Sequence, residues 1–442
     1  MNIQLSDHFT YTKLLRFTAP SICMMIFTSF YSIVDGLFIS NYTDVTQFAA
    51  INLVWPFIMI FGAIGFMFGS GGSALIAKTL GEGRKFKALR IFSLLIYTAI
   101  ILGIIIAIGG IWLIKPILEA FGAHGELLAA ALKYSRIIIP AIPFFMLQYT
   151  FQSLLVTAER PKLGFAVTFI SGMTNIVLDA LFIVKLNMGL IGAALATSAG
   201  IMVGGLIPLI YFCIDNKSPL RLGKTSLYWH SLLKICTNGL SEFVTVISQA
   251  VVTTLYNYQM LLFLGENGVA AYGIITYLSF VFAALFLGYA FGSAPITSFH
   301  FGAKNHAELH SLFVKNLKII FCFAILMTLS AEFFAPFLTS FFIQNNNELF
   351  RLTVEGFRIY AVSFLFAGFS IFASSFFTAL NNGIVSAVIS VLRTLVFECI
   401  CVMVIPAFFG VGGIWAAIII AEILALSTSI YFFISRQKYY GY

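Results

Sequence analysis

Charged residues are scarce in this chain of 442 residues: Asp, Glu, Lys and Arg make up 10% of it, whereas hydrophobic residues make up 60%. Soluble globular domains carry about 25% charged residues, so this composition excludes an ordinary soluble protein. In place of charge the chain has a series of apolar runs, and a helix needs about 20 such residues to cross a bilayer. These runs cover nearly the whole length and leave no room for a soluble catalytic domain. We therefore predict an all-α integral membrane protein.

The chain also lacks the clusters that a metal site or a nucleophilic enzyme would need. Its six cysteines lie in or at the ends of apolar runs without metal-ligand spacing, which is typical of cysteine acting as a small core hydrophobe. His300 is the one histidine near the interior of a span, and it has no partner at ligand spacing. We therefore expect neither an enzyme nor a cofactor.

The apolar runs predict twelve membrane spans. Their ranges are 14–40, 46–79, 88–115, 129–157, 161–185, 189–213, 231–264, 268–299, 311–338, 352–380, 383–407 and 411–435. Lys and Arg concentrate in alternate loops, for example Arg84 and Lys85, whereas the opposite loops hold little beyond Lys115, Lys185 and Arg351. Cytoplasmic loops carry the excess of Lys and Arg, so both termini are predicted to be cytoplasmic. The net charge of +8 is then mainly a topology signal and does not indicate nucleic-acid binding.

The longest polar connector, residues 215–230, divides the spans six and six. Four segments match between the halves in the same order, at an offset of about 220 residues; one pair is AAINLVWPF at 49–57 and AAYGIITYL at 270–278. Such self-similarity indicates a duplication.

The duplication predicts an N-lobe at 1–214, a cytoplasmic linker at 215–230 and a C-lobe at 231–442. Because each half has six spans, both halves cross the membrane in the same orientation, so a pseudo-twofold axis should run along the membrane normal. This is one plan of secondary transporters, which bind their substrate between the halves.

Four oxygen-bearing side chains of the N-lobe are predicted to share one layer of the membrane. An acidic side chain at the centre of a span costs about 2.5 to 3.5 kcal/mol. Asp35 and Asp179 both lie about 9 Å below the predicted outer ends of their spans, at 1.5 Å per residue. Thr197 lies about 12 Å below the outer end of the next span, and Asn175 is one helical turn below Asp179.

Two carboxylates close together in a low-dielectric site cannot both stay charged without a cation. Carboxylate, amide and hydroxyl oxygens suit a hard cation or a shared proton, so the layer predicts Na⁺ or H⁺ binding. The alternative is that Asn175 and Asp179 form structural hydrogen bonds between helices.

The other buried acids are weaker candidates. Glu242 lies in a different layer, near the cytoplasmic third of its span. Glu398 follows Arg393 by five residues, so a structural pair or network competes with substrate contact. Glu422 is in the middle of its span, where recognition of substrate charge competes with bonding between helices. Glu332 is near an outer helix end, where we expect it to be solvated.

These residues resemble the multidrug and toxic compound extrusion (MATE) transporters, and the resemblance covers essentially the whole chain. The residues that carry it are Pro20, Asp35 fifteen residues later, Asn175, Asp179 and Thr197. The resemblance implies that the last four bind Na⁺ or a proton, that the first helix bends at the proline, and that drug leaves as the cation enters. Tyr31 matches a position that lines the N-lobe pocket of the family.

The sequence departs from the family in the C-lobe. Some members have a second cation site there, with an aspartate in the tenth span, whereas this span holds only Glu355, near its outer end. Glu242 is the candidate match for the glutamate of that site, with a substrate or gating role. The coupling site is therefore predicted in the N-lobe.

The leading hypothesis is a monomeric antiporter in the plasma membrane, coupled to Na⁺ or H⁺, that exports amphipathic, mostly cationic compounds by alternating access. Its partners would be drug-like small molecules and lipids. The first alternative is a flippase for lipid-linked oligosaccharides, which would need a strongly basic cavity, although arginine in mid-membrane is limited to Arg393. The second alternative is a passive channel, which gradient-independent flux would reveal.

Overall fold

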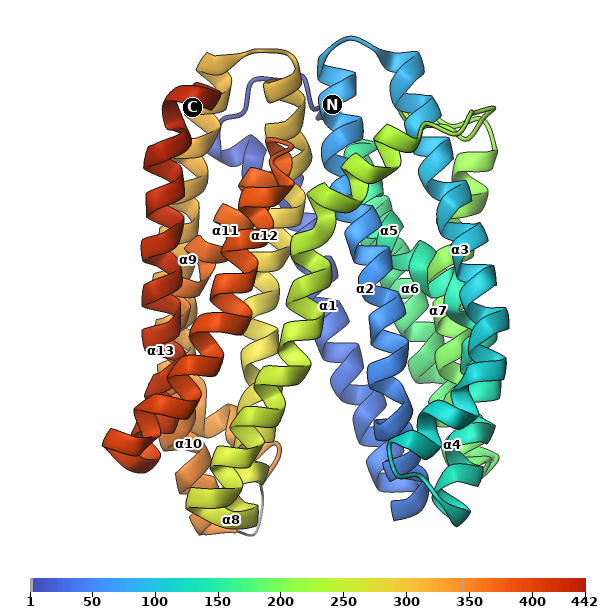
Figure 1. The fold of residues 1–442 in the computed structure, drawn as a ribbon, viewed down its shortest axis with the longest axis vertical. Helices are drawn as coiled ribbons and strands as arrows, with labels where there is room; N and C mark the ends of the chain where they lie inside the picture. The colour runs from blue at the N-terminus through green and yellow to red at the C-terminus, as the bar shows by residue number, and fades with distance from the viewer. Residues whose placement is uncertain (1–2, 344–345) are drawn as a thin grey trace.

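Helices form almost all of the computed structural model, which describes residues 3–343 and 346–442 (Figure 1). The α-helices are α1 (Tyr11–Tyr42), α2 (Val45–Gly81), α3 (Lys85–Ala120), α4 (Gly125–Ile138), α5 (Ile142–Thr157), α6 (Pro161–Asp179), α7 (Gly189–Cys213), α8 (Trp229–Gly302), α9 (His306–Ser340), α10 (Asn347–Ala361), α11 (Phe364–Ala379), α12 (Gly383–Val391) and α13 (Glu398–Tyr440). A 3₁₀ turn, η1 (Ile139–Ala141), and two π-helical turns, η2 (Ala180–Lys185) and η3 (Leu392–Phe397), join some of them.

Two of the helical runs are double spans. Among the described residues, nine helical runs are long and apolar enough to cross a membrane, and the bent pair of α10 and α11 makes ten. A straight helix as long as α8, with 74 residues, would measure about 111 Å, far more than the roughly 30 Å of a bilayer core. Gly265 in α8 and Gly410 in α13 have φ of 63° and 58°, which glycine adopts readily, and each ends one span and begins the next.

Because two of these ten helical runs each contain two spans, the described part of the chain has twelve membrane spans, as predicted. The predicted gaps at 265–267 and 408–410 contain these two glycines. The prediction differs in detail at 129–157, where Pro140 and Pro143 lack backbone N–H donors and the chain passes through η1. It also differs at 352–380, where the chain bends by 51° between α10 and α11.

The helices form two bundles side by side (Figure 1). We keep the names N-lobe for α1 to α7 and C-lobe for α8 to α13; the exact residue limits of the lobes stay a prediction. Each lobe has its own apolar core, one around Phe92, Phe145 and Phe151 and the other around Tyr256, Phe357 and Trp415.

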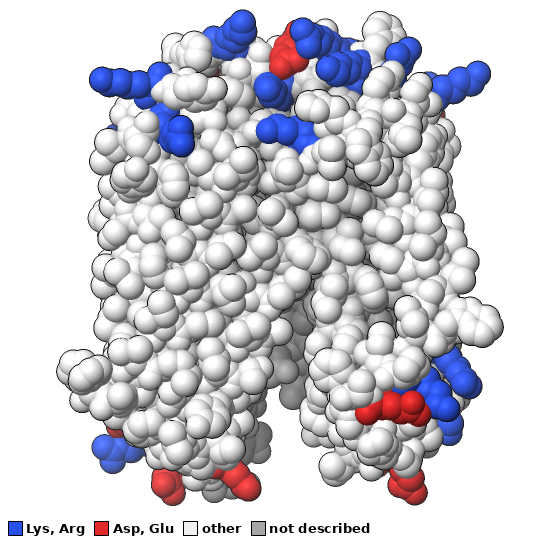
Figure 2. All heavy atoms as spheres, viewed as in Figure 1, with Lys and Arg blue, Asp and Glu red and all other residues white. Residues whose placement is uncertain are grey.

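Both chain termini lie at the same end of the molecule, where Lys and Arg gather; we call it the basic end (Figures 1 and 2). At the opposite end, Figure 2 shows a cleft between the two lobes.

The lobes touch closely near the basic end. A methyl group on Gly71 of α2 would lie 2.0 Å from the carbonyl oxygen of Ile235 in α8, and one on Gly302 of α8 would lie 2.1 Å from that of Lys78 in α2. The absence of a side chain at these two glycines therefore allows the backbones of α2 and α8 to approach each other. This contact closes the molecule at the basic end.

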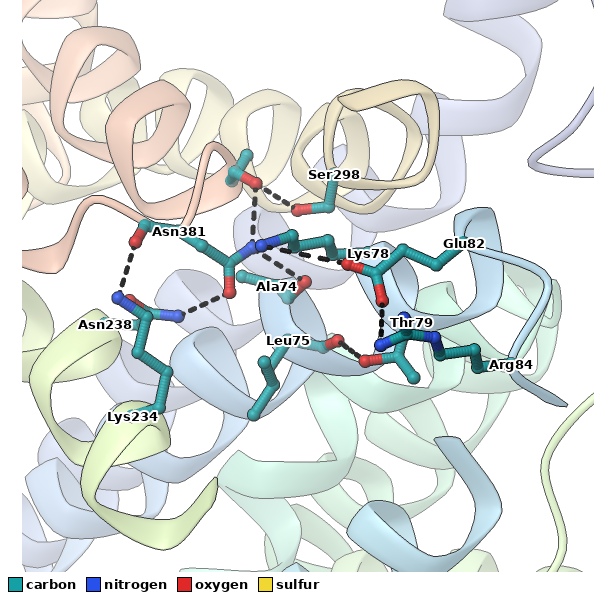
Figure 3. Close-up of polar contacts among 11 residues, drawn as sticks. Ala74, Leu75, Lys78, Thr79, Glu82, Arg84, Lys234, Asn238, Ser298 and Asn381 are labelled. Atoms are coloured by element: carbon teal, nitrogen blue, oxygen red, sulfur yellow. Dashed lines mark hydrogen bonds and ion pairs between the residues drawn. The ribbon is translucent and has the colours of Figure 1, made fainter. Parts of the chain in front are cut away.

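Asn381, in the turn between α11 and α12, joins this contact (Figure 3). Its amide nitrogen donates to the carbonyl oxygen of Ala74 in the N-lobe at 3.2 Å. Its side-chain oxygen accepts from Asn238 Nδ2 at 2.8 Å, and its backbone carbonyl accepts from Lys234 Nζ at 2.8 Å. One side chain thus connects two C-lobe segments to the N-lobe.

Candidate functional site

Three N-lobe helices, α1, α6 and α7, bring the predicted oxygen-bearing side chains together. Asn175 Nδ2 in α6 donates to Asp35 Oδ1 in α1 at 3.3 Å. The carboxyl groups of Asp35 and Asp179 lie close enough to interact electrostatically. Asn175, Asp179 and Thr197 are 4%, 0% and 8% exposed, whereas Asp35 is half-buried.

Small residues set how closely these helices approach. A methyl group on Gly200 of α7 would lie 3.0 Å from Asn175 Cβ and from the carbonyl oxygen of Ser171. Ser171 Oγ in turn donates to the carbonyl oxygen of Gly200 at 2.7 Å. Because α6 and α7 run antiparallel and Thr197 is one turn before Gly200, this contact places Thr197 beside the turn of α6 that carries Asp179.

Four oxygen atoms in this layer have no hydrogen-bond partner among the described residues. They are Asn175 Oδ1, both carboxylate oxygens of Asp179, and Thr197 Oγ1. A buried polar atom left unpaired costs about 1 to 3 kcal/mol, so four of them in one place indicate a ligand. Oxygens from two carboxylates, an amide and a hydroxyl match the preference of a hard cation or of a proton shared between the acids.

The helix that carries Asp179 changes its geometry directly after this residue. The α-helix α6 ends at Asp179 and continues as the π-helical turn η2, where the sequence predicts one regular span to 185. Single π-helical turns inside helices are frequent at functional sites. Nothing in the hydrophobic pattern indicates this turn.

Tyr134 of α4 is a site residue that the sequence reasoning missed. It is 1% exposed and interacts electrostatically with both Asp35 and Asp179. Its position in an amphipathic, partly polar helix gave no depth signal like that of an isolated acid. Its phenol adds a polar group from a fourth helix within electrostatic range of the two carboxylates.

The structure places the predicted gating residues in different parts of the molecule. Tyr31 lies one turn before Asp35, and its Cδ1 would be 3.0 Å from a methyl group on Gly172 of α6. Pro20 is inside α1, which continues through it from Tyr11 to Tyr42; the predicted bending there stays a prediction. Glu242 is half-buried in α8 of the C-lobe, where its electrostatic partner is Arg393.

The C-lobe holds a buried ion pair whose partners the sequence left open. Arg393 of η3 donates from Nη2 to Glu422 Oε1 at 2.7 Å and from Nε to both carboxylate oxygens at 2.9 and 3.1 Å. The two side chains are 18% and 2% exposed. Glu398 therefore does not hold this guanidinium, although it lies within electrostatic range of it. Glu332 is partly exposed, 3.8 Å from Arg358.

Two bundles of membrane-spanning helices that meet at one end, with an oxygen-lined site inside one bundle, define a membrane transporter and not an enzyme. The model of the MatE family matches this chain twice, at residues 20–181 and 242–404. The chain belongs to the MatE family, and the predicted resemblance to the MATE transporters is confirmed.

Similar proteins match over nearly the whole chain. The multidrug export protein MepA of Staphylococcus saprophyticus is 24% identical over 430 residues, which is 96% of this chain and 94% of that protein. MepA of Staphylococcus haemolyticus is 23% identical over 416 residues, which is 93% of this chain and 90% of that protein.

Solved structures confirm the fold class. A multidrug resistance MATE family transporter of the MOP superfamily, in an outward-facing conformation, superposes with a TM-score of 0.93 at 22% identity, over 99% of this chain and 98% of that one. A MATE structure in a straight conformation gives a TM-score of 0.92 at 22% identity, over 98% of this chain and 97% of that one.

Proposed function

We propose that the chain is an antiporter that couples the entry of Na⁺ or H⁺ to the export of amphipathic, mostly cationic drugs or toxic metabolites. The observation that carries this proposal is the group of four unpartnered buried oxygens on Asn175, Asp179 and Thr197, next to Asp35. Asp35, Asn175, Asp179 and Thr197 bind the coupling cation in this proposal.

The coupling follows from charge balance. Because the two carboxylates interact electrostatically, both can stay charged only when a metal cation compensates their repulsion; otherwise a proton neutralises one of them. Release of the cation therefore changes the free energy of the N-lobe, and the transporter can use that change to favour one conformation over the other. The same oxygens serve Na⁺ and H⁺, so both remain candidates.

Alternating access is supported by the asymmetry of the two ends. The cleft opens at the end opposite the basic end (Figure 2), and the close contact of α2 with α8 closes the basic end. If the basic end is cytoplasmic, as the excess of Lys and Arg favours, this is an outward-open state of a plasma-membrane protein with both termini in the cytoplasm. Export then requires a second state in which the basic end opens.

The proposed substrate class rests on aromatic residues where the lobes meet. Phe66 of α2 lies 3.9 Å from Tyr149 of α5 and 6.3 Å from Phe291 of α8, measured between ring centroids. Aromatic faces attract organic cations, and the MepA relatives are named multidrug export proteins. The flippase alternative is not favoured, because Glu422 neutralises the mid-membrane Arg393.

Everted membrane vesicles test the proposal. An imposed Na⁺ or pH gradient should drive uptake of a fluorescent cationic dye, and Asp35→Asn should reduce this uptake by about 100-fold because the variant cannot hold the cation. Asp44→Asn makes the same chemical change at the exposed start of α2 and should transport normally. Full gradient-driven uptake by Asp35→Asn would contradict the assignment, and dye flux without any gradient would indicate a channel.

A further inference from the structure

The linker that joins α7 to α8 lies against the first turns of α3, at the outer edge of the N-lobe (Figure 1). Thr225 Oγ1 donates a hydrogen bond to the carbonyl oxygen of Arg90 at 2.8 Å, and the backbone N–H of Gly223 donates to Ser93 Oγ at 3.0 Å. The hydroxyl of Tyr97 donates to the carbonyl oxygen of Gly223 at 3.2 Å. The linker is therefore attached to one face of α3.

A cleft with a volume of about 350 Å³ opens between the linker and α3. Its walls are the stretch of α3 from Phe86 to Ser93 and residues 221–224 of the linker. Sites for small molecules have volumes of about 300 to 1,000 Å³. The cleft is thus large enough for a ligand of the size of a phosphate ester.

Three basic side chains line this cleft: Arg90, Arg221 and Lys224. Arg221 is paired with Asp215. Arg90 Nη1 donates to the neutral hydroxyl of Tyr228 at 3.1 Å, and no ion pair between described residues includes Arg90 or Lys224. Two positive charges at the cleft are therefore uncompensated, and Arg and Lys side chains both bind phosphate oxygens through charge-assisted hydrogen bonds.

An apolar stripe on α3 begins at the cleft and leads away from it. Positions 86, 90, 93, 97, 101, 104 and 108 recur at intervals of three or four residues, so they share one face of the helix. Tyr97, Ile101, Ile104 and Ile108 on this face are 38% to 58% exposed. Because α3 is apolar enough to cross a membrane, this uncovered face would contact lipid acyl chains.

The cleft lies at the level of the lipid headgroups. Phe86 and Ser93 are one and eight residues from the start of α3, so at 1.5 Å per residue they are within about 12 Å of the end of the helix. Phe86 is 84% exposed, and amphipathic aromatic side chains are common at the membrane–water interface. Basic pockets on the cytoplasmic side of membrane proteins bind anionic headgroups. A free anion would use only the cleft, whereas a phospholipid would use both the cleft and the stripe.

We propose that Arg90, Arg221 and Lys224 bind the phosphate group of an anionic phospholipid, whose acyl chains lie along the stripe from Tyr97 to Ile108. The bound lipid completes the attachment of the linker to the N-lobe, because its phosphate contacts α3 and the linker at the same time. This inference goes beyond the proposed antiport and holds for either coupling cation.

Lipid titrations of the purified protein in detergent, followed by native mass spectrometry, test the site. Wild-type protein should bind phosphatidylglycerol at least about tenfold more tightly than phosphatidylcholine with the same acyl chains, because only the first has a net negative charge. Arg90→Gln combined with Lys224→Gln should raise the Kd for phosphatidylglycerol about 30-fold.

A matched control separates the cleft from the general positive charge of the basic end. Arg436→Gln combined with Lys438→Gln removes the same two residue types from the exposed last turns of α13. This control should bind phosphatidylglycerol with the wild-type Kd. Equal weakening in the two double variants would overturn the proposal, since the whole basic end would then attract the lipid.

Free phosphates distinguish a lipid site from a site for a soluble anion. Inorganic phosphate and glycerol phosphate should each bind at least about 100-fold more weakly than phosphatidylglycerol, because they make no contact with the apolar stripe. An affinity as high as that of phosphatidylglycerol would assign the cleft to a soluble anion and overturn the lipid proposal.

Tryptic cleavage of wild-type protein covers the case in which a variant fails to fold. Trypsin cuts after Arg221 and Lys224, and a bound headgroup should keep both side chains from the protease. We expect these cuts to be at least about fivefold slower in nanodiscs of phosphatidylglycerol than in nanodiscs of phosphatidylcholine. Cleavage after Arg436 and Lys438 should occur at the same rate in both lipids. Equal rates at Arg221 and Lys224 in the two lipids would contradict the proposal.

Discussion

In the N-lobe, Asp35 and Asp179 share a layer with an amide and a hydroxyl, and the hydrogen bonds of the described residues bring no basic side chain to either acid. In the C-lobe, the corresponding spans carry Arg393 paired with Glu422, and two more glutamates. In our proposal the N-lobe binds an exchangeable cation, whereas the C-lobe contains a fixed cation, the Arg393 guanidinium paired with Glu422. The comparison shows that corresponding spans of the two lobes carry different charges: two acids without a basic partner in the N-lobe, and a paired Arg393 with Glu422 in the C-lobe.

The largest expected difference between the lobes is in stability. Glu422→Leu leaves the buried Arg393 without its partner and should lower the free energy of unfolding by about 3 to 5 kcal/mol. Asp35→Asn should change it little, since the amide can still accept from Asn175 and one repulsive charge is removed. Chemical denaturation in detergent micelles measures both.

The double variant Arg393→Met with Glu422→Leu sharpens this test. It removes both charges together, so it should recover most of the stability that Glu422→Leu loses. Glu332→Leu is the control at a partly exposed acid, whose side chain is 38% exposed, with an expected change within about 0.5 kcal/mol. Equal loss in Asp35→Asn and Glu422→Leu would show that the two lobes do not differ in the way proposed here.

The next effect concerns helix packing in the N-lobe. Gly200→Ala would place a methyl group 3.0 Å from Asn175 Cβ, and such overpacking costs about 1 to 3 kcal/mol. It should also weaken coupling, because it moves Thr197 away from Asn175. Gly36→Ala is the matched control, since a methyl group there meets no atom within 4 Å. A Gly200→Ala protein as stable and as active as Gly36→Ala would contradict the packing role.

The smallest effect concerns the contact between the lobes. Asn381 has a φ of 59°, so Asn381→Gly keeps the backbone conformation and removes the bonds of its side chain to Ala74 and Asn238. Loss of these bonds should favour opening of the basic end by about 1 kcal/mol.

Electron paramagnetic resonance distances between spin labels at Lys87 and His310, both exposed at the basic end, measure this opening. We expect a larger population of long distances in Asn381→Gly than in the same labelled protein with Asn381 intact. An unchanged distance distribution would mean that the contact of α2 with α8 closes the basic end without help from Asn381.

Much of the fold could be predicted because the sequence shows directly how long each apolar segment is and where the turns between segments fall. The spans around Gly265 and Gly410 are examples: the break in hydrophobicity falls where a glycine adopts a positive φ. The number of residues from each helix end also predicted that Asp35, Asn175, Asp179 and Thr197 share one layer. In the structure, Asn175 Nδ2 lies 3.3 Å from Asp35 Oδ1.

The features that escaped prediction depend on how helices rotate against one another. Arg393 is five residues from Glu398 but bonds to Glu422, 29 residues away, and Tyr134 of α4 lies within electrostatic range of the two aspartates. The depth of a residue along a span does not determine which neighbouring helix its side chain faces. The two π-helical turns also change the direction in which the following side chains point.

By itself, the sequence determined the class of protein and the number of spans and predicted the duplication and the depth of each ionisable residue, because these follow from hydrophobicity and rise per residue along one chain. Only the tertiary structure decided which buried charges are paired and which are left over. The reason is that a charge pair needs two side chains on facing surfaces of two helices, and close contacts such as Gly200 against Asn175 fix those surfaces only when the helices are packed.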